Sequence, residues 1–144
     1  MASTDTVKLL KECNSGIKMG INALEEVLPD IKDGHFQEIL ENSLKEHRKL
    51  EEDTKDALNR IGDEGKEPHK MAQGMAWFKT NVMMTMEKTD KTAADLLTDG
   101  CHMGIKSINK YLNQDKDADE DAKKIVKDII EIEENLAQKI RVYL

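Results

Sequence analysis

The chain has 144 residues and a formal net charge of −7; 35% of its residues are charged and only 3% are aromatic. This length fits one domain that buries its own core. The acidic balance argues against nucleic acid as a partner, because binding phosphates needs a concentrated basic patch.

The N-terminal segment does not read as a signal peptide, because Lys8, Lys11 and Glu12 interrupt any apolar stretch within residues 1–20. No run approaches the ~20 apolar residues of a membrane span, so we expect no membrane contact. Two cysteines without an export signal are typical of a reducing compartment. We therefore expect a cytoplasmic protein.

The first predicted helix starts at Ser3, Thr4 or Asp5, each a good N-cap, and ends at Pro29. A short turn over Asp30–Gly34 leads into a second helix, with Asp33 or Gly34 at its start. That helix carries a heptad-like seam of Phe36, Leu40, Ser43, His47, Leu50, Thr54, Ala57 and Ile61. So short a turn makes the two helices antiparallel, which gives a hairpin over residues 5–61.

The clearest break is GDEGKEP, Gly62–Pro68. Within the segment 62–89 we expect a further helix with an apolar stripe of Met71, Met75, Phe78, Val82 and Met86. Thr89 or Asp90 then caps the first helix of a second hairpin, over residues 90–143. The acidic run Asp115–Asp121 reads as a turn and helix start, where carboxylates are favoured, rather than as a cation site.

The two hairpins share a motif. CNSGIK begins at Cys13 and CHMGIK begins at Cys101, so that Gly16 and Gly104 match at the same offset. Further along, Ile39, Leu50 and Leu58 correspond to Ile125, Leu136 and Leu144 at a slightly different offset. Glycine within a helix costs ~1 kcal/mol relative to alanine. We therefore predict that Gly16 and Gly104 mark a close crossing of two helices, flanked by the small residues Cys13 and Cys101.

The connecting segment indicates the topology. A helix of ~27 residues is about 40 Å long, and residues 62–89 can travel back along that length. A single domain of residues 1–144 then results, an all-α four-helix bundle with one long crossover that contains an extra helix. This is the ferritin-like arrangement.

Two stretches carry a resemblance to a known family. MAWFKTNVMMTM (Met75–Met86) and LTDGCHMGIKSINKYLNQ (Leu97–Gln114) resemble an uncharacterised bacterial family with a ferritin-like bundle, and the first hairpin is similar to it as well. The resemblance covers nearly the whole chain. It implies the bundle fold but names no activity, because no catalytic signature accompanies it.

A di-iron carboxylate bundle needs Glu-x-x-His on two of its helices, and this chain has none. The alternative is a degenerate metal site around His47 on the seam of the second helix, with Glu51, Glu133 and His102 as further ligands and Asn14 nearby. We expect Glu133 to lie about one turn from His47 along the bundle. The structural interpretation, which we prefer, is a buried histidine hydrogen-bonded to Ser43 or to a neighbouring helix.

Soft-metal binding is a further alternative, because the crossover holds several methionines. They serve equally as flexible core residues. Met83 and Met84 fall towards the other side of the crossover helix together with Trp77, which suggests a second buried surface or an oligomer contact. Cys13 and Cys101 are expected to stay reduced in the core.

These observations favour a non-enzymatic interaction protein that forms a homodimer, with no cofactor. The alternative function is metal binding, as an iron oxidase or carrier, with iron ahead of copper.

Overall fold

The computed structural model describes residues 3–62 and 87–144. Four long helices make up nearly all of these two ranges: α1 (Thr4–Val27), α2 (Gly34–Arg60), α4 (Asp90–Gln114) and α5 (Glu120–Lys139). Two short 3-10 turns, η1 (Leu28–Asp30) and η2 (Arg141–Tyr143), follow α1 and α5. The prediction of an all-α four-helix bundle is confirmed, with no strand in the described residues.

Each helix starts at a side chain that accepts one of the free backbone N–H groups of its first turn. The N-caps are Ser3, Asp33, Thr89 and Asp119, and their acceptors lie 2.9–3.2 Å from the nitrogen three residues on. The acidic run therefore acts as expected: Asp119 caps α5 and carboxylates occupy the following turn. Local chemistry alone sets these four boundaries.

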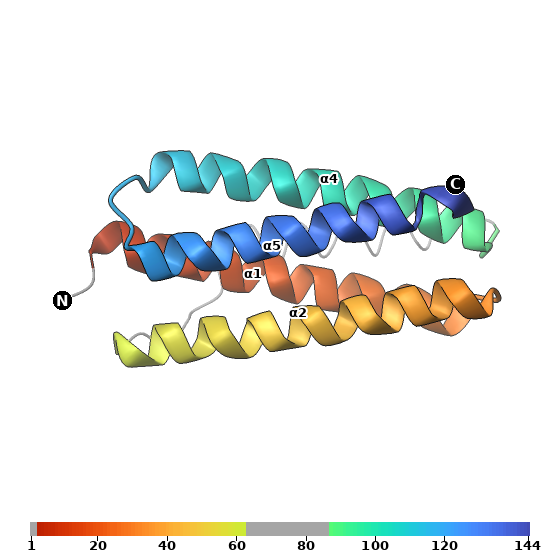
Figure 1. The fold of residues 1–144 in the computed structure, drawn as a ribbon, viewed down its shortest axis with the longest axis horizontal. Coiled ribbons are helices and arrows are strands. Elements are labelled where there is room, and N and C mark those ends of the chain that lie inside the picture. Colours follow the sequence, from red (N-terminus) through yellow and green to blue (C-terminus); the bar gives the residue numbers. More distant parts are fainter. Residues whose placement is uncertain (1–2, 63–86) are drawn as a thin grey trace.

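The bundle consists of two antiparallel hairpins (Figure 1). α1 pairs with α2 and α4 pairs with α5, while α1 also packs on α4 and α2 on α5. α2 ends at one end of the bundle and α4 begins at the other (Figure 1). Residues 63–86 connect these ends and lie outside the described part, as do the predicted crossover helix and the interface candidates Trp77, Met83 and Met84.

The core runs along the bundle axis and is aliphatic. Its most enclosed side chains belong to both hairpins and include Leu9, Ile17, Leu24, Phe36, Leu40, Leu58, Val126 and Ile140. Burial of such side chains is worth ~1.5–3 kcal/mol each, which makes this seam the main source of stability. Within the described ranges, none of the helices combines the length and the apolar character needed to cross a membrane.

The start of α1 binds the turn between α4 and α5. The Asp5 carboxylate accepts the backbone N–H of Asp117 at 3.0 Å, and the Thr6 hydroxyl accepts that of Asp119 at 2.8 Å. Ser3 donates its hydroxyl proton to the Asp117 carbonyl at 3.0 Å. These bonds join the two hairpins at one end, and at the other end Phe36 of α2 stacks on Tyr143 with ring centroids 4.3 Å apart.

Among the described residues, the repeated glycines do not mark the close contact that the sequence suggested. A Cβ atom added at Gly16 or Gly104 would meet no described atom within 4 Å. Neither glycine therefore brings two of the described helices together, although Cys13 and Cys101 beside them are buried. Of the glycines that the structure describes, the one in close contact is Gly20, one turn further along α1.

Candidate functional site

The middle of the apolar core contains a polar contact between α2 and α5. His47 is 1% exposed and Glu133 is 9% exposed. The Nε2 atom of His47 lies 2.7 Å from Oε1 of Glu133. The heptad-like seam of α2 directs His47 inward, as it does Leu40 and Leu50 on either side. A polar pair thus replaces an apolar layer at this level.

The second ring nitrogen of His47 is also occupied. Nδ1 donates to the carbonyl oxygen of Ser43 at 2.7 Å, one helical turn back. A carbonyl only accepts, so this bond fixes a proton on Nδ1 and leaves Nε2 for Glu133. The expected hydrogen bonds of a buried histidine, to Ser43 and to a neighbouring helix, are both confirmed.

Burial by itself would lower the pKa of His47, because it disfavours the imidazolium. The hydrogen bond and the negative charge of Glu133 act in the opposite direction, with smaller help from the Ser43 carbonyl and from Glu46. The balance raises the pKa of His47 above its ordinary value. The position of Glu133 therefore favours the imidazolium form of His47, in which the contact is a charge-assisted hydrogen bond.

α4 contributes Cys101 to the same layer. Burial raises the pKa of the Cys101 thiol, and the charge of Glu133 and a hydrogen bond to its carboxylate raise it further. The Cys101 thiol contacts the Glu133 carboxylate, and this carboxylate contacts the His47 imidazole. Nucleophilic activation needs the imidazole next to the thiol and a lowered thiol pKa. This arrangement therefore keeps Cys101 as an unreactive thiol.

On α1, the residue next to the His47 ring is Gly20, which has no side chain. A Cβ atom at Gly20 would lie 2.8 Å from Cδ2 and 2.9 Å from Nε2 of His47, and 3.6 Å from Oε1 of Glu133. The imidazole ring thus packs directly against the backbone of α1. Sequence reasoning did not identify Gly20, because it falls outside the repeated motif; its one signal was its place inside a helix.

His47 and Glu133 occupy equivalent positions in the two hairpins. They are 86 residues apart, and the same separation relates the N-caps Ser3 and Thr89 as well as Asp33 and Asp119. In a pair of related units, equivalent residues touch each other only beside the two-fold axis. The contact therefore marks the approximate two-fold axis between the hairpins.

The structure brings together two of the four residues that the sequence suggested as metal ligands. Glu133 touches His47 directly instead of lying a turn away, because α2 and α5 pack with these positions level. Glu51 pairs with Lys55 at 3.5 Å, and His102 is exposed on α4. In residues 3–62 and 87–144, no three His, Cys, Asp or Glu side chains are arranged to hold an ion.

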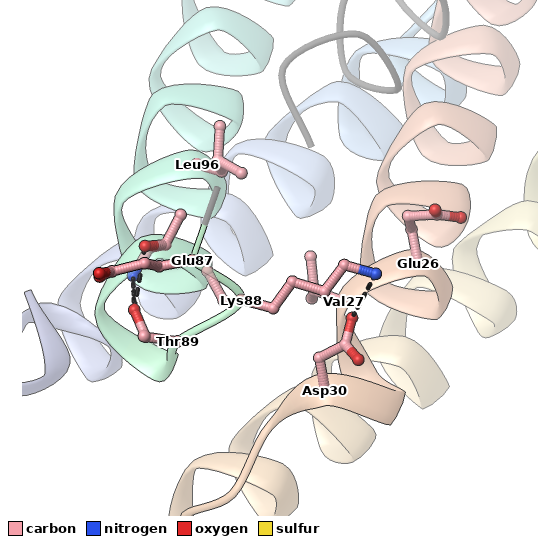
Figure 2. A pocket seen from close by; sticks show the side chains of 9 residues that line it. Glu26, Val27, Asp30, Glu87, Lys88, Thr89 and Leu96 are labelled. Atoms are coloured by element: carbon pink, nitrogen blue, oxygen red, sulfur yellow. Dashed lines mark hydrogen bonds and ion pairs between the residues drawn. The ribbon is translucent and has the colours of Figure 1, made fainter. Parts of the chain in front are cut away.

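A shallow pocket lies elsewhere, between the end of α1 and the start of α4 (Figure 2). Its lining residues are Glu26, Val27, Asp30, Glu87, Lys88, Thr89, Thr92, Ala93 and Leu96. Lys88 extends across it to Asp30, with Nζ and Oδ2 3.9 Å apart (Figure 2). Both partners are largely exposed, so this pair is a weak surface contact.

Comparison with known proteins gives no relative. No protein-family model, no curated protein and no solved structure matches the chain.

Proposed function

We propose that this chain is a non-enzymatic, cytoplasmic helical bundle that acts through the outer surface of its helices and forms a homo-oligomer. We also propose that it is ferritin-like and belongs with the uncharacterised bacterial family that its sequence resembles. The helix directions support this, since α2 ends and α4 begins at opposite ends of the bundle (Figure 1).

The central polar layer supports a role without catalysis. Both ring nitrogens of His47 are bonded, Glu133 is shared between His47 and Cys101, and the thiol pKa is raised. General acid–base and nucleophilic groups need access to a substrate and a pKa near the working pH. These groups instead bond to one another inside the core.

The observation that carries the proposal is a difference between the two copies of the repeat. After Cys13 on α1, Asn14 and Ser15 are buried; after Cys101 on α4, His102 and Met103 are exposed. Met103 is 48% exposed. Equivalent helix faces thus differ, and the α4 face presents a large apolar side chain to solvent, which is typical of a contact surface.

The test is the mass in solution of the full chain by size-exclusion chromatography with light scattering, over a range of concentrations. We expect a dimer that Met103→Glu weakens and that Val142→Glu, at an even more exposed position (80%) near the end of α5, leaves intact. A strict monomer at high concentration would remove the homo-oligomer from the proposal. A dimer unaffected by Met103→Glu would place the contact elsewhere.

A metal-binding function is the second candidate, and one observation favours it. The bond from Nδ1 to the Ser43 carbonyl holds the His47 ring with Nε2 directed at a carboxylate, as metal-binding histidines are held. The metal would be iron, with copper second. The test is elemental analysis of protein purified without a chelating tag after iron and copper supplementation: stoichiometric metal that Glu133→Gln abolishes supports binding here, and its absence excludes it.

A further inference from the structure

We propose that the contact between His47 and Glu133 selects which hairpin pairs with which: it admits α2 against α5 and rejects the α2–α2 and α5–α5 pairings that a second copy of this chain offers. The surface concerned is the seam between the hairpins. The partner that it discriminates against is the identical hairpin of another molecule. This goes beyond the proposed function, which concerns the outer surface.

The two hairpins are equivalent at the level of this contact. His47 and Glu133 hold the same position relative to the N-caps of their helices, Asp33 and Asp119. They touch beside the approximate two-fold axis, at 2.7 Å. If two copies of one hairpin paired in the same geometry, the same residue would stand on both sides of that axis. His47 would then face His47, or Glu133 would face Glu133.

The aliphatic residues on either side of the pair do not distinguish these pairings. Leu40 and Leu50 of α2 are buried, and so are their counterparts on α5, Val126 and Leu136. Aliphatic side chains of similar volume exchange at low cost. At these positions the seam accepts either hairpin, so the polar contact between them is the part of the layer that discriminates.

Other buried polar groups on α2 lack this selectivity because they are satisfied within the helix. The Thr54 hydroxyl donates to the carbonyl of Leu50 at 2.7 Å, in its own helix. That bond survives in any pairing. The Glu133 carboxylate does need a cation from the opposite helix, since its other described contact, the Cys101 thiol, is neutral.

Electrostatic interactions disfavour the wrong pairings. Two like charges in a buried contact repel each other in a medium of low dielectric, whereas opposite charges attract. A slip of one helix along the other would leave both groups buried without a partner. A buried ion pair adds little net stability compared with an apolar pair, and its best-attested use is to fix register and partner choice. The geometry therefore indicates that this pair determines which helices pack together and in which register.

The experiment replaces the pair in the full chain by two residues that cannot discriminate. His47→Leu with Glu133→Leu makes the layer apolar, and His47→Gln with Glu133→Gln makes it polar but self-complementary. Thr54→Val is the matched control, because it removes a buried polar group from the same helix. Each protein is unfolded in denaturant and refolded over a concentration series, and its masses are measured by light scattering after size exclusion.

At each concentration we expect Thr54→Val to refold to the same species as the wild type. Both double variants should refold cooperatively and give additional heavier species, rising at least about tenfold in mass fraction over the wild type at high concentration. A single wild-type species in both double variants would overturn the proposal. The same mixture from Thr54→Val would overturn it too, as would failure of both double variants to fold, since a specificity device is dispensable for stability.

Because each variant is compared with the wild-type species, the result does not depend on whether that species is a monomer or the proposed dimer.

Discussion

Asp90, in the first turn of α4, holds the turn between α1 and α2 through the backbone of Asp33. Its two carboxylate oxygens accept the N–H groups of Lys32 at 2.8 Å and of Asp33 at 2.9 Å. Asp33 in turn caps α2 by accepting the N–H of Phe36. The contact corresponds to that of Asp5 and Thr6 at the opposite end of the bundle. Each hairpin thus binds the turn of the other.

We predict that Asp90→Ala lowers the free energy of unfolding by about 1–2 kcal/mol, because two backbone N–H groups lose a charged acceptor. The control is Asp95→Ala, which removes the same charge from an exposed position on the same helix. Urea titration followed by circular dichroism measures both variants. Equal effects of the two substitutions would mean that general charge, and not the bond to the turn, is responsible.

Gly20→Ala is predicted to destabilise the protein by about 1–3 kcal/mol, because the new methyl group would overlap the His47 ring. Bonds to Ser43 and Glu133 hold that ring on both sides, so it cannot move away cheaply. Gly104→Ala is the matched control: its Cβ meets no described atom within 4 Å, and it should gain up to ~1 kcal/mol of helix propensity. Thermal or urea unfolding shows whether each substitution lowers or raises the stability. A higher stability of both variants would contradict the packing at Gly20.

Stability is predicted to fall as the pH rises through the pKa of His47. Burial opposes the imidazolium, but Glu133 together with the Ser43 carbonyl and Glu46 outweighs it and raises the folded-state pKa above the ordinary 6.5. A raised pKa means that the protonated form stabilises the fold. This contribution is fully present below the unfolded-state pKa and is lost as the pH rises through the folded-state value.

The measurement is the free energy of unfolding of the wild type and of His47→Gln between about pH 6 and 9, with a chelator present. We expect the advantage of the wild type to shrink across this window. The other histidines are the same in both proteins, so any contribution from them cancels in the difference. A difference that stays constant with pH would mean that His47 is neutral throughout.

Both cysteines are predicted to be inert in the folded protein. Burial, followed by the charge of Glu12, raises the pKa of Cys13; burial, followed by the charge and the hydrogen bond of Glu133, raises that of Cys101. The thiolate is the reactive form. A thiol reagent at mildly alkaline pH should therefore detect two thiols per chain in denaturant and none rapidly under native conditions. Rapid native labelling of either one would show that the core opens at that site.

The sequence by itself determined the helices and their ends. Ser3, Asp33, Thr89 and Asp119 were recognisable as caps or turn residues, because a cap bonds to the backbone of its own first turn. The seam that contains His47 could also be recognised in the sequence, since inward positions recur with the helical period. The acidic run, read as a turn and a helix start, needed no tertiary information either.

Only the tertiary structure decided which residues of different helices contact each other. The height of one helix against another depends on the geometry of the connecting turns, and an error of one turn is 5.4 Å. That error separated Glu133 from His47 in the sequence-based estimate, whereas the structure places them 2.7 Å apart. The same dependence on height made Gly20, rather than the repeated Gly16 and Gly104, the glycine on which the His47 ring packs.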